Sequence, residues 1–152
     1  MTAIHIENLS KTYKDRTVLN QVHLTVAQGE AFGILGSESS GKTTLMRILM
    51  HFMFPSAGSA SILGHEIDKE ASEIRKKTAY IPQDPVFYDD LSVADLIRYG
   101  TGSLTGRKTA ADRKMLLETF ALDPKAMGWE LSRRERTKLA VTIALLRDPA
   151  VF

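Results

Sequence analysis

The sequence predicts an α/β fold on three observations. Residues 3–9 and 17–26 alternate apolar and polar side chains, which is the pattern of strands that are buried on one face. An apolar segment and a glycine-containing loop come next, and residues 42–54 then carry apolar side chains at helical spacing. A length of 152 residues with 43% hydrophobic and 25% charged residues fits one globular domain.

The first half of the chain is expected to contain both strands and helices. The apolar segment "AFGILG", residues 31–36, predicts a buried strand that follows the two half-exposed ones. Pro55 and Gly58 end the helix that comes after the loop, and its methionines and phenylalanines are expected to pack in the core. The other elements expected here are a strand at 59–64, a charged helix at 69–77 and a strand at 78–84.

The second half is predicted to be mostly helical, because it contains three capping patterns. In each pattern a Ser or Thr precedes an acidic residue by three positions, so that the hydroxyl and the carboxylate each accept a backbone N–H. Pro149 ends the last helix, and the residues "AVF" are expected to begin another strand. The three pairs are Ser92 with Asp95, Thr109 with Asp112, and Ser132 with Glu135.

Composition and charge exclude several classes of protein. The absence of cysteine excludes a disulfide framework and thiolate metal ligands. The four histidines are scattered without a second ligand at metal spacing, so no histidine metal site is expected. A net charge of +2 gives no general argument for nucleic acid as a partner. No apolar run approaches the ~20 residues that a membrane helix needs.

The strongest local signal lies between the strand expected at 31–36 and the following helix. Residues 36–43 match the pattern G-x-x-x-x-G-K-[ST] in the strand, loop and helix context that it requires. In such a loop, backbone N–H groups and the helix dipole surround phosphate oxygens, the lysine contacts the outer phosphates, and the hydroxyl ligates Mg²⁺. The residues expected to bind a nucleotide are Gly36, Ser37, Glu38, Ser39, Ser40, Gly41, Lys42, Thr43 and Thr44.

Two residues of this loop oppose the function that the pattern predicts. Glu38 places a carboxylate in a loop built for anions, so its side chain must point to water if phosphate is to bind. Ser39 lacks the conformational freedom that glycine has in such a loop. Nucleotide binding is therefore expected, with an affinity that these two residues lower.

The whole chain resembles the first two thirds of the ATP-binding subunit of an ABC transporter. The resemblance rests on four stretches, which are "LSKTYKDRTVLNQVHLTVAQGEAFGILG", "GSESSGKTTLMRIL", "PSAGSASILG" and "TAYIPQDPVFYDDLSVADLIRYG". Within that family the branch that energises small two-component drug exporters is the most similar. The resemblance implies a P-loop ATPase domain of the ABC type, with an antiparallel β subdomain and a helical subdomain. Its parts would be an ATP-binding core at 1–83, the helical subdomain at 84–147 and the start of the next core strand at 148–152.

The resemblance also implies roles for single residues. Tyr13 is similar to the aromatic residue that stacks on adenine, and Gln83 to the glutamine that reaches Mg²⁺ and the attacking water. Ser132 is similar to the serine of the family signature Leu-Ser-Gly-Gly-Gln, which contacts the γ-phosphate held by the opposite subunit. The implied cofactors are ATP and Mg²⁺, with Thr43 and Gln83 as metal ligands and Gln83 as the expected catalytic residue.

The chain departs from this family at two places. The signature reads "LSRRE", in which Arg133 and Arg134 replace the glycines and obstruct the close backbone approach that glycine permits. Ser132 and Glu135 therefore have a second interpretation, as the cap of a helix with a solvated basic face. The apolar strand that ends in Asp-Glu in the family, where the carboxylates hold Mg²⁺ and polarise the attacking water, is also absent. Binding with little or no hydrolysis is expected, and a sequence truncated before that strand is the simplest explanation.

As a family member, the chain is expected to bind Mg-ATP and to drive export, either as a homodimer or beside a paired ATP-binding subunit. The implied partner is a membrane permease, with the chain cytoplasmic and peripheral on the inner face of the cell membrane. Whether this chain is itself an ATPase stays open. A second hypothesis is a non-catalytic nucleotide-binding regulatory module or a gene remnant. A third, a nucleic-acid binder that uses the basic residues of 133–138, is disfavoured, so nucleic acid is not an expected partner.

Overall fold

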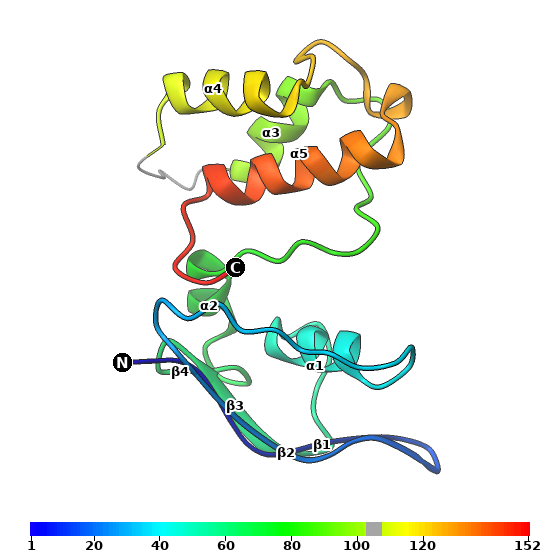
Figure 1. The fold of residues 1–152 in the computed structure, drawn as a ribbon, viewed down its shortest axis with the longest axis vertical. Coiled ribbons are helices and arrows are strands. Elements are labelled where there is room, and N and C mark those ends of the chain that lie inside the picture. Colours follow the sequence, from blue (N-terminus) through cyan, green and yellow to red (C-terminus); the bar gives the residue numbers. More distant parts are fainter. Residues whose placement is uncertain (103–107) are drawn as a thin grey trace. The chain divides into compact units, whose positions relative to one another are not determined.

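The computed structural model describes residues 1–102 and 108–152, which divide into two compact units (Figure 1). The first unit is Met1–Lys76 and the second is Lys77–Phe152. All named strands belong to the first unit, and the second is mainly helical. The predicted mixture of an antiparallel sheet with helices is therefore confirmed.

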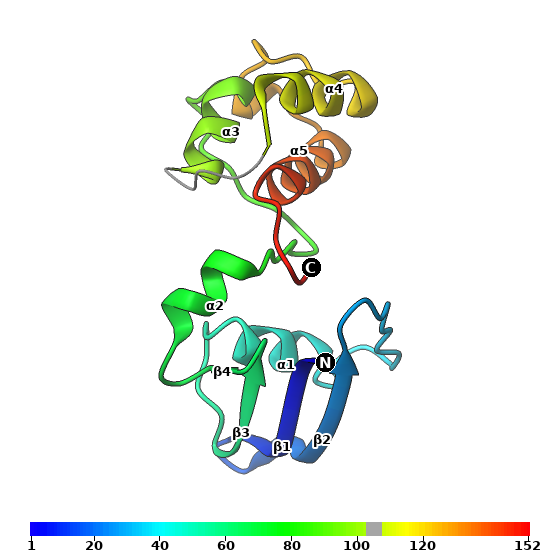
Figure 2. The same ribbon diagram turned by 90° about the vertical axis from the view of Figure 1, so that its left-hand side faces the viewer.

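The first unit is built on a four-stranded antiparallel sheet in the order β2-β1-β3-β4 (Figure 2). Strands β1 (Thr2–Tyr13) and β2 (Arg16–Ala27) confirm the two strands that the alternating patterns predict, and they pair as a long hairpin. Its two-residue turn begins at Lys14, which takes a φ of 51°, as the tight turns of hairpins require. Strands β3 (Ala57–Ile62) and β4 (His65–Glu66) complete the sheet.

Helix α1 (Lys42–Leu49) packs on this sheet and contributes the buried side chains of Leu45, Ile48 and Leu49. The side chains of Ile6 and Leu9 of β1 are also almost fully buried. Burial of each such aliphatic side chain stabilises the fold by about 1.5–3 kcal/mol. The core of the first unit thus lies between α1 and the sheet, next to the loop that precedes α1.

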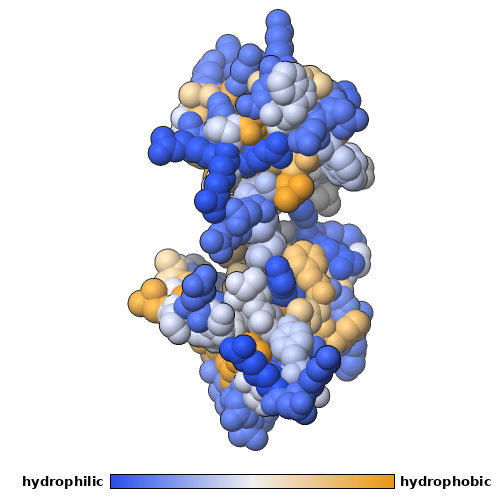
Figure 3. Space-filling view, turned by 90° about the vertical axis from the view of Figure 1, so that its right-hand side faces the viewer, coloured by the Kyte–Doolittle hydropathy of each residue, from blue (hydrophilic) through white to orange (hydrophobic). Residues whose placement is uncertain are grey.

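Three predictions for this unit are wrong. Residues 31–36 form no strand and are exposed, and the exposed fraction reaches 97% for Leu35. Within the described residues no strand pairs with this segment, so its backbone lacks the neighbours that a buried strand needs. Helix α1 ends at Leu49 and not at residue 54. Phe52 and Phe54, which were expected to pack in the core, are exposed. Figure 3 shows hydrophobic residues, drawn orange, among the hydrophilic ones at the surface.

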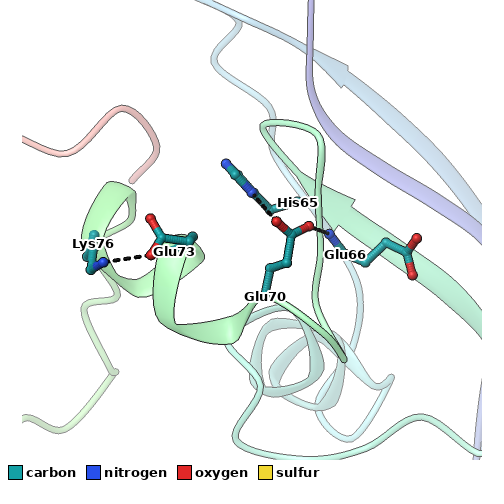
Figure 4. Close-up of polar contacts among 5 residues, drawn as sticks. All are labelled: His65, Glu66, Glu70, Glu73 and Lys76. Atoms are coloured by element: carbon teal, nitrogen blue, oxygen red, sulfur yellow. Dashed lines mark hydrogen bonds and ion pairs between the residues drawn. The ribbon is translucent and has the colours of Figure 1, made fainter.

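A carboxylate fixes the connection between β4 and the short helix α2 (Ala71–Lys77) (Figure 4). One oxygen of Glu70 lies 2.9 Å from Nδ1 of His65, and the other accepts the backbone N–H of Glu66 at 3.2 Å. On the helix itself, Lys76 pairs with Glu73 at 2.6 Å. These contacts place the predicted charged helix directly after β4.

The second unit contains three longer helices, α3 (Val93–Thr101), α4 (Ala110–Phe120) and α5 (Arg133–Leu146). Helices α3 and α4 both pack against α5, and a single turn of 3-10 helix, η1 (Gly128–Glu130), precedes α5. Aliphatic side chains from the helices and their connections form one core. Its buried members are Val93, Leu96, Ile97, Leu122, Leu131, Leu139 and Leu146.

The strand expected at 78–84 is reduced to one parallel bridge, between Thr78 and Val151. The N–H of Ala79 donates to the carbonyl of Val151 at 2.9 Å, so the segment "AVF" does lie beside residues 78–79. Pro82 and Pro85 lack the N–H groups that a longer ladder would need. Among the described residues the pairing consists of this one bridge.

All three predicted capping patterns are confirmed. Thr109 and Ser132 form complete capping boxes with Asp112 and Glu135, and Ser92 accepts the backbone N–H of Asp95 at 3.1 Å. These residues satisfy N–H groups that are otherwise unpaired at the start of a helix. Local sequence therefore determines where α3, α4 and α5 begin.

Acidification below about pH 4 is expected to destabilise these helices. The Ser92 hydroxyl, the Thr109 backbone N–H and the Ser132 hydroxyl hold the pKa values of Asp95, Asp112 and Glu135 below their ordinary ranges. A carboxylate whose pKa is lower in the folded state stabilises the fold above its unfolded pKa, and this stabilisation is lost as the pH falls through the folded pKa. Helical circular dichroism followed during an acid titration measures the effect. The Asp112→Asn/Glu135→Gln variant should lose less signal on acidification, and an unchanged acid transition would contradict the prediction.

Candidate functional site

The loop that precedes α1 curls around the ammonium group of Lys42. Its Nζ donates to the carbonyl oxygens of Gly36 and Ser37 at 2.7 and 2.6 Å and to Oγ of Ser40 at 3.1 Å. A bond of 3.3 Å from the N–H of Ser40 to the carbonyl of Ser37 closes the turn. Because a lysine ammonium carries three donors and no acceptor, these oxygens use its full donor capacity. The lysine predicted to contact phosphate is thus held within the loop.

Two glycines of the pattern permit this geometry. A Cβ atom on Gly36 would lie 2.6 Å from Oγ of Ser40, inside the loop. Gly41 has a φ of 94°, and a Cβ there would lie 2.9 Å from Cδ2 of Leu19 and 3.0 Å from the carbonyl oxygen of Val18. Gly41 therefore meets two requirements at once, a left-handed backbone and close approach to β2.

The first turn of α1 offers backbone N–H groups to a ligand. The N-cap residue is Gly41, and no side chain of the described residues caps the helix. The helical bonds begin with the N–H of Leu45, which donates to the carbonyl of Gly41 at 2.9 Å. The N–H groups at the start of a helix have no partner within it, and the helix dipole makes this end electropositive. Such an end binds phosphate oxygens.

A cavity of about 230 Å³ opens beside this helix end. Among the described residues that line it, none carries a carboxylate, and two carry a positive charge. Glu38 is exposed and does not belong to the lining. Ser39 has a φ of 63°, in the left-handed region where glycine is favoured. The lining residues are Arg16, Val18, Ser39, Ser40, Gly41, Lys42, Thr43 and Thr44.

Tyr13 lies at the end of β1 in the same unit but does not line this cavity. Its hydroxyl lies 2.7 Å from Sδ of Met53, and the residue is 42% exposed. The ammonium of Lys11 lies 5.2 Å from the ring centroid, a cation–π contact. A base that stacks on this ring must use its exposed part or displace Lys11.

Gln83 and Ser132 belong to the second unit, whereas the loop belongs to the first. Gln83 is exposed in an irregular segment between Pro82 and Pro85. Ser132 is the N-cap of α5, and its hydroxyl lies 2.5 Å from a carboxylate oxygen of Glu135. The capping interpretation of Ser132 is therefore confirmed, and its role toward a nucleotide stays a prediction.

The arginines that follow Ser132 make specific contacts within the second unit. Arg133 pairs with Asp84 at 2.6 Å, although both side chains are largely exposed. Arg136 is more buried, and its Nη2 donates to Asp89 at 2.9 Å and to the carbonyl of Gly128 at 2.8 Å. The start of α5 is thereby connected to the segment that follows Gln83.

Sequence reasoning missed Arg16 and Val18 as members of the cavity. The hairpin places them there, because Arg16 is the first residue of β2 and pairs directly with Tyr13 across the turn. The available signal was the strand–turn–strand pattern. It brings residues shortly after the turn to the same end of the sheet as Tyr13.

The chain is similar to known proteins along its whole length. The sequence profile of a family described as "ABC transporter" matches residues 19–152. Nod factor export ATP-binding protein I of Rhizobium etli is 33% identical over 156 residues, which cover 100% of this chain and 49% of that protein. Fe(3+) ions import ATP-binding protein FbpC 2 of Pectobacterium atrosepticum is 29% identical over 98% of this chain and 44% of its own length. The chain thus spans about half the length of these relatives.

Solved structures have the same fold. One described as the ATP binding subunit of an ABC transporter matches with a TM-score of 0.84 and 25% identity, covering 97% of this chain and 63% of that chain. A bacterial Atm1-family ABC exporter with ATP bound matches with a TM-score of 0.83 and 24% identity, covering 97% of this chain and 28% of that chain. Among the described residues of this chain, no helix has the length and apolar character needed to cross a bilayer.

Proposed function

Because this chain belongs to the ABC transporter family, we propose that it binds Mg-ATP at residues 36–44 and acts as the ATP-binding subunit of a transporter. The observation that carries the proposal is the loop wrapped around Lys42, whose Nζ lies 2.6–3.1 Å from three loop oxygens. The uncapped start of α1 and the cavity without a lining carboxylate support it.

The residues present fit a nucleotide polyphosphate. The backbone N–H groups of residues 41–44 would hold the phosphate oxygens, with Lys42 supplying positive charge and the Thr43 hydroxyl a ligand for Mg²⁺. Gln83 would be a second ligand of the metal, Tyr13 would stack on the base, and Ser132 would contact the nucleotide of a paired subunit. When bound, Mg-ATP supplies the phosphoanhydride whose binding and cleavage drive transport.

Binding with little hydrolysis is the second part of the proposal. Efficient hydrolysis needs a carboxylate that orients and polarises the attacking water. The described lining of the cavity contains hydroxyls, N–H groups and two cations but no carboxylate. The groups present therefore favour retention of a bound nucleotide over its turnover by this chain.

The transport role rests on the relatives. The first relative is named for Nod factor export and another for import of Fe(3+) ions. We favour export, in keeping with the resemblance to the drug-export branch. The subunit would then work as a homodimer or beside a second ATP-binding subunit, attached to a membrane permease at the cytoplasmic face of the membrane.

Calorimetric titration of the 152-residue chain with ATP, in the presence and absence of Mg²⁺, tests the proposal. ATP is expected to bind, and adenosine, which lacks phosphate, to bind at least about tenfold more weakly, because charge-assisted hydrogen bonds to phosphate contribute most of the affinity. Thr43→Val should remove the gain in affinity that Mg²⁺ provides, whereas Thr43→Ser keeps the hydroxyl and should retain it. Equal affinities for ATP and adenosine, or no binding of ATP, would contradict the proposal.

A further inference from the structure

Arg16 occupies a defined position beside the phosphate loop. It is the first residue of β2, pairs with Tyr13 across the two-residue turn, and lines the cavity together with residues 39–44. The strand that carries it touches the loop, because a Cβ on Gly41 would lie 3.0 Å from the carbonyl oxygen of Val18. Val18 follows Arg16 by two residues and also lines the cavity. The hairpin thus holds the Arg16 backbone at a fixed place relative to the loop.

The side chain of Arg16 has unused donor capacity. Within the described part of the chain it makes no hydrogen bond or ion pair, whereas the other cation of the cavity, Lys42, is bound to three loop oxygens. A guanidinium group is always charged and has five N–H donors in a planar fork. This fork matches two oxygens of a phosphate group and binds them more specifically than an ammonium does.

Arg16 also changes the net charge around the loop. Residues 36–44 contain one carboxylate, Glu38, and one ammonium, Lys42, so the segment has no formal net charge. A polyphosphate carries several negative charges, and within the loop the repulsion from Glu38 opposes the attraction that Lys42 and the helix dipole provide. With Arg16 counted, the charges of Arg16, Lys42 and Glu38 sum to a positive value. Arg16 thereby offsets the repulsion between Glu38 and a phosphate group.

We propose that Arg16 is a second cationic ligand of the polyphosphate chain, which it contacts from β2 while the loop holds the opposite side. The assignment rests on the proposed function of the loop as a nucleotide site. It extends that site from a single loop to a loop and a strand. It also explains how nucleotide binding tolerates a glutamate at position 38.

The test compares Arg16→Gln with Lys14→Gln by calorimetric titration with two probes, ATP and inorganic triphosphate. Both variants remove one positive charge from the same hairpin, but Lys14 lies in the turn and does not line the cavity. Arg16→Gln is expected to weaken both probes by a similar factor, on the order of tenfold, as the loss of a charge-assisted contact predicts. Lys14→Gln should leave both affinities within about twofold of the unmodified chain, because an exposed charge away from the site is largely screened. Arg16→Lys should restore part of the loss, because it keeps the charge without the planar fork.

The outcomes separate this assignment from the function on which it rests. If the unmodified chain binds neither ATP nor triphosphate, the nucleotide site itself is wrong and Arg16 has no phosphate to bind. If the chain binds both probes and Arg16→Gln behaves like Lys14→Gln, only the Arg16 assignment is overturned. If Arg16→Gln lowers the affinity for ATP but not the affinity for triphosphate, Arg16 contacts the nucleoside. That result would also overturn the assignment of Arg16 to the polyphosphate chain. Circular dichroism melting of all three variants verifies that they remain folded.

Discussion

Replacement of Lys42 by alanine is expected to weaken the binding of Mg-ATP by about 10–100-fold. Hydrogen bonds to charged groups contribute about 1.5–3 kcal/mol each, and 1.4 kcal/mol corresponds to a tenfold change in affinity. The replacement removes a positive charge from the cavity and also the donor that joins Gly36, Ser37 and Ser40. Calorimetric titration with ATP and Mg²⁺ measures the loss.

Arg47→Ala is a matched control for this experiment, because it removes a cation from the last turn of the same helix. Arg47 is exposed and does not line the cavity, so its replacement should change the affinity by less than about twofold, as expected for a screened surface charge. If the affinity for Mg-ATP falls by the same factor in both variants, the change in net charge alone explains the result. The specific role of Lys42 would then be excluded.

Replacement of Leu139 by alanine is expected to destabilise the second unit by about 2–5 kcal/mol, the usual cost of removing a buried leucine side chain. Leu139 has an exposed fraction of 0% and belongs to the hydrophobic core of the second unit. Since this unit carries Gln83 and Ser132, its unfolding would separate two expected site residues from the fold that supports them. Chemical denaturation followed by circular dichroism measures the change in the free energy of unfolding.

Met115→Ala provides the comparison for the second unit. Met115 lies on α4 and is 55% exposed, so its truncation leaves no sealed cavity and should cost well under about 1 kcal/mol. A similar loss of stability in both variants would show that Leu139 has no special place in the core. An unchanged denaturation midpoint for Leu139→Ala would contradict the burial that the structure assigns to it.

Local chemistry made much of the fold predictable. The alternation in residues 3–9 and 17–26 correctly predicted two strands, because one face of each strand packs against a core. Hydroxyl and carboxylate side chains spaced by three residues correctly placed the starts of α3, α4 and α5. Each of these signals depends only on neighbours in the sequence.

Elements that need a distant partner were less predictable. The apolar residues 31–36 have the composition of a buried strand, but no described strand pairs with them. The composition of a segment gives no information on whether a neighbouring strand is present to pair with it. The apolar spacing that indicated a helix as far as residue 54 continues past Leu49, where the backbone leaves the helix and His51 takes a φ of 53°. Periodicity gives the polarity of each position but not the point at which the backbone turns.

The candidate site shows the same division. The spacing of the phosphate-loop pattern identified the loop, its glycines and the start of α1 at Lys42. Arg16 and Val18 were missed, because they join the cavity only through the register of the hairpin and the contact of β2 with Gly41. The role of Glu38 was also undecided in the sequence, and its exposed position outside the lining is a property of the folded loop.

The hydrogen bonds that hold Lys42 have a thermodynamic consequence for any anion that enters the loop. A free lysine side chain loses rotamer freedom worth about 1.5–2 kcal/mol when it is ordered. Because Nζ of Lys42 is already bound to three oxygens of the protein, that entropy is lost during folding and not during association. A phosphate group bound at the proposed site would replace protein oxygens as acceptors around an ammonium whose position is already ordered.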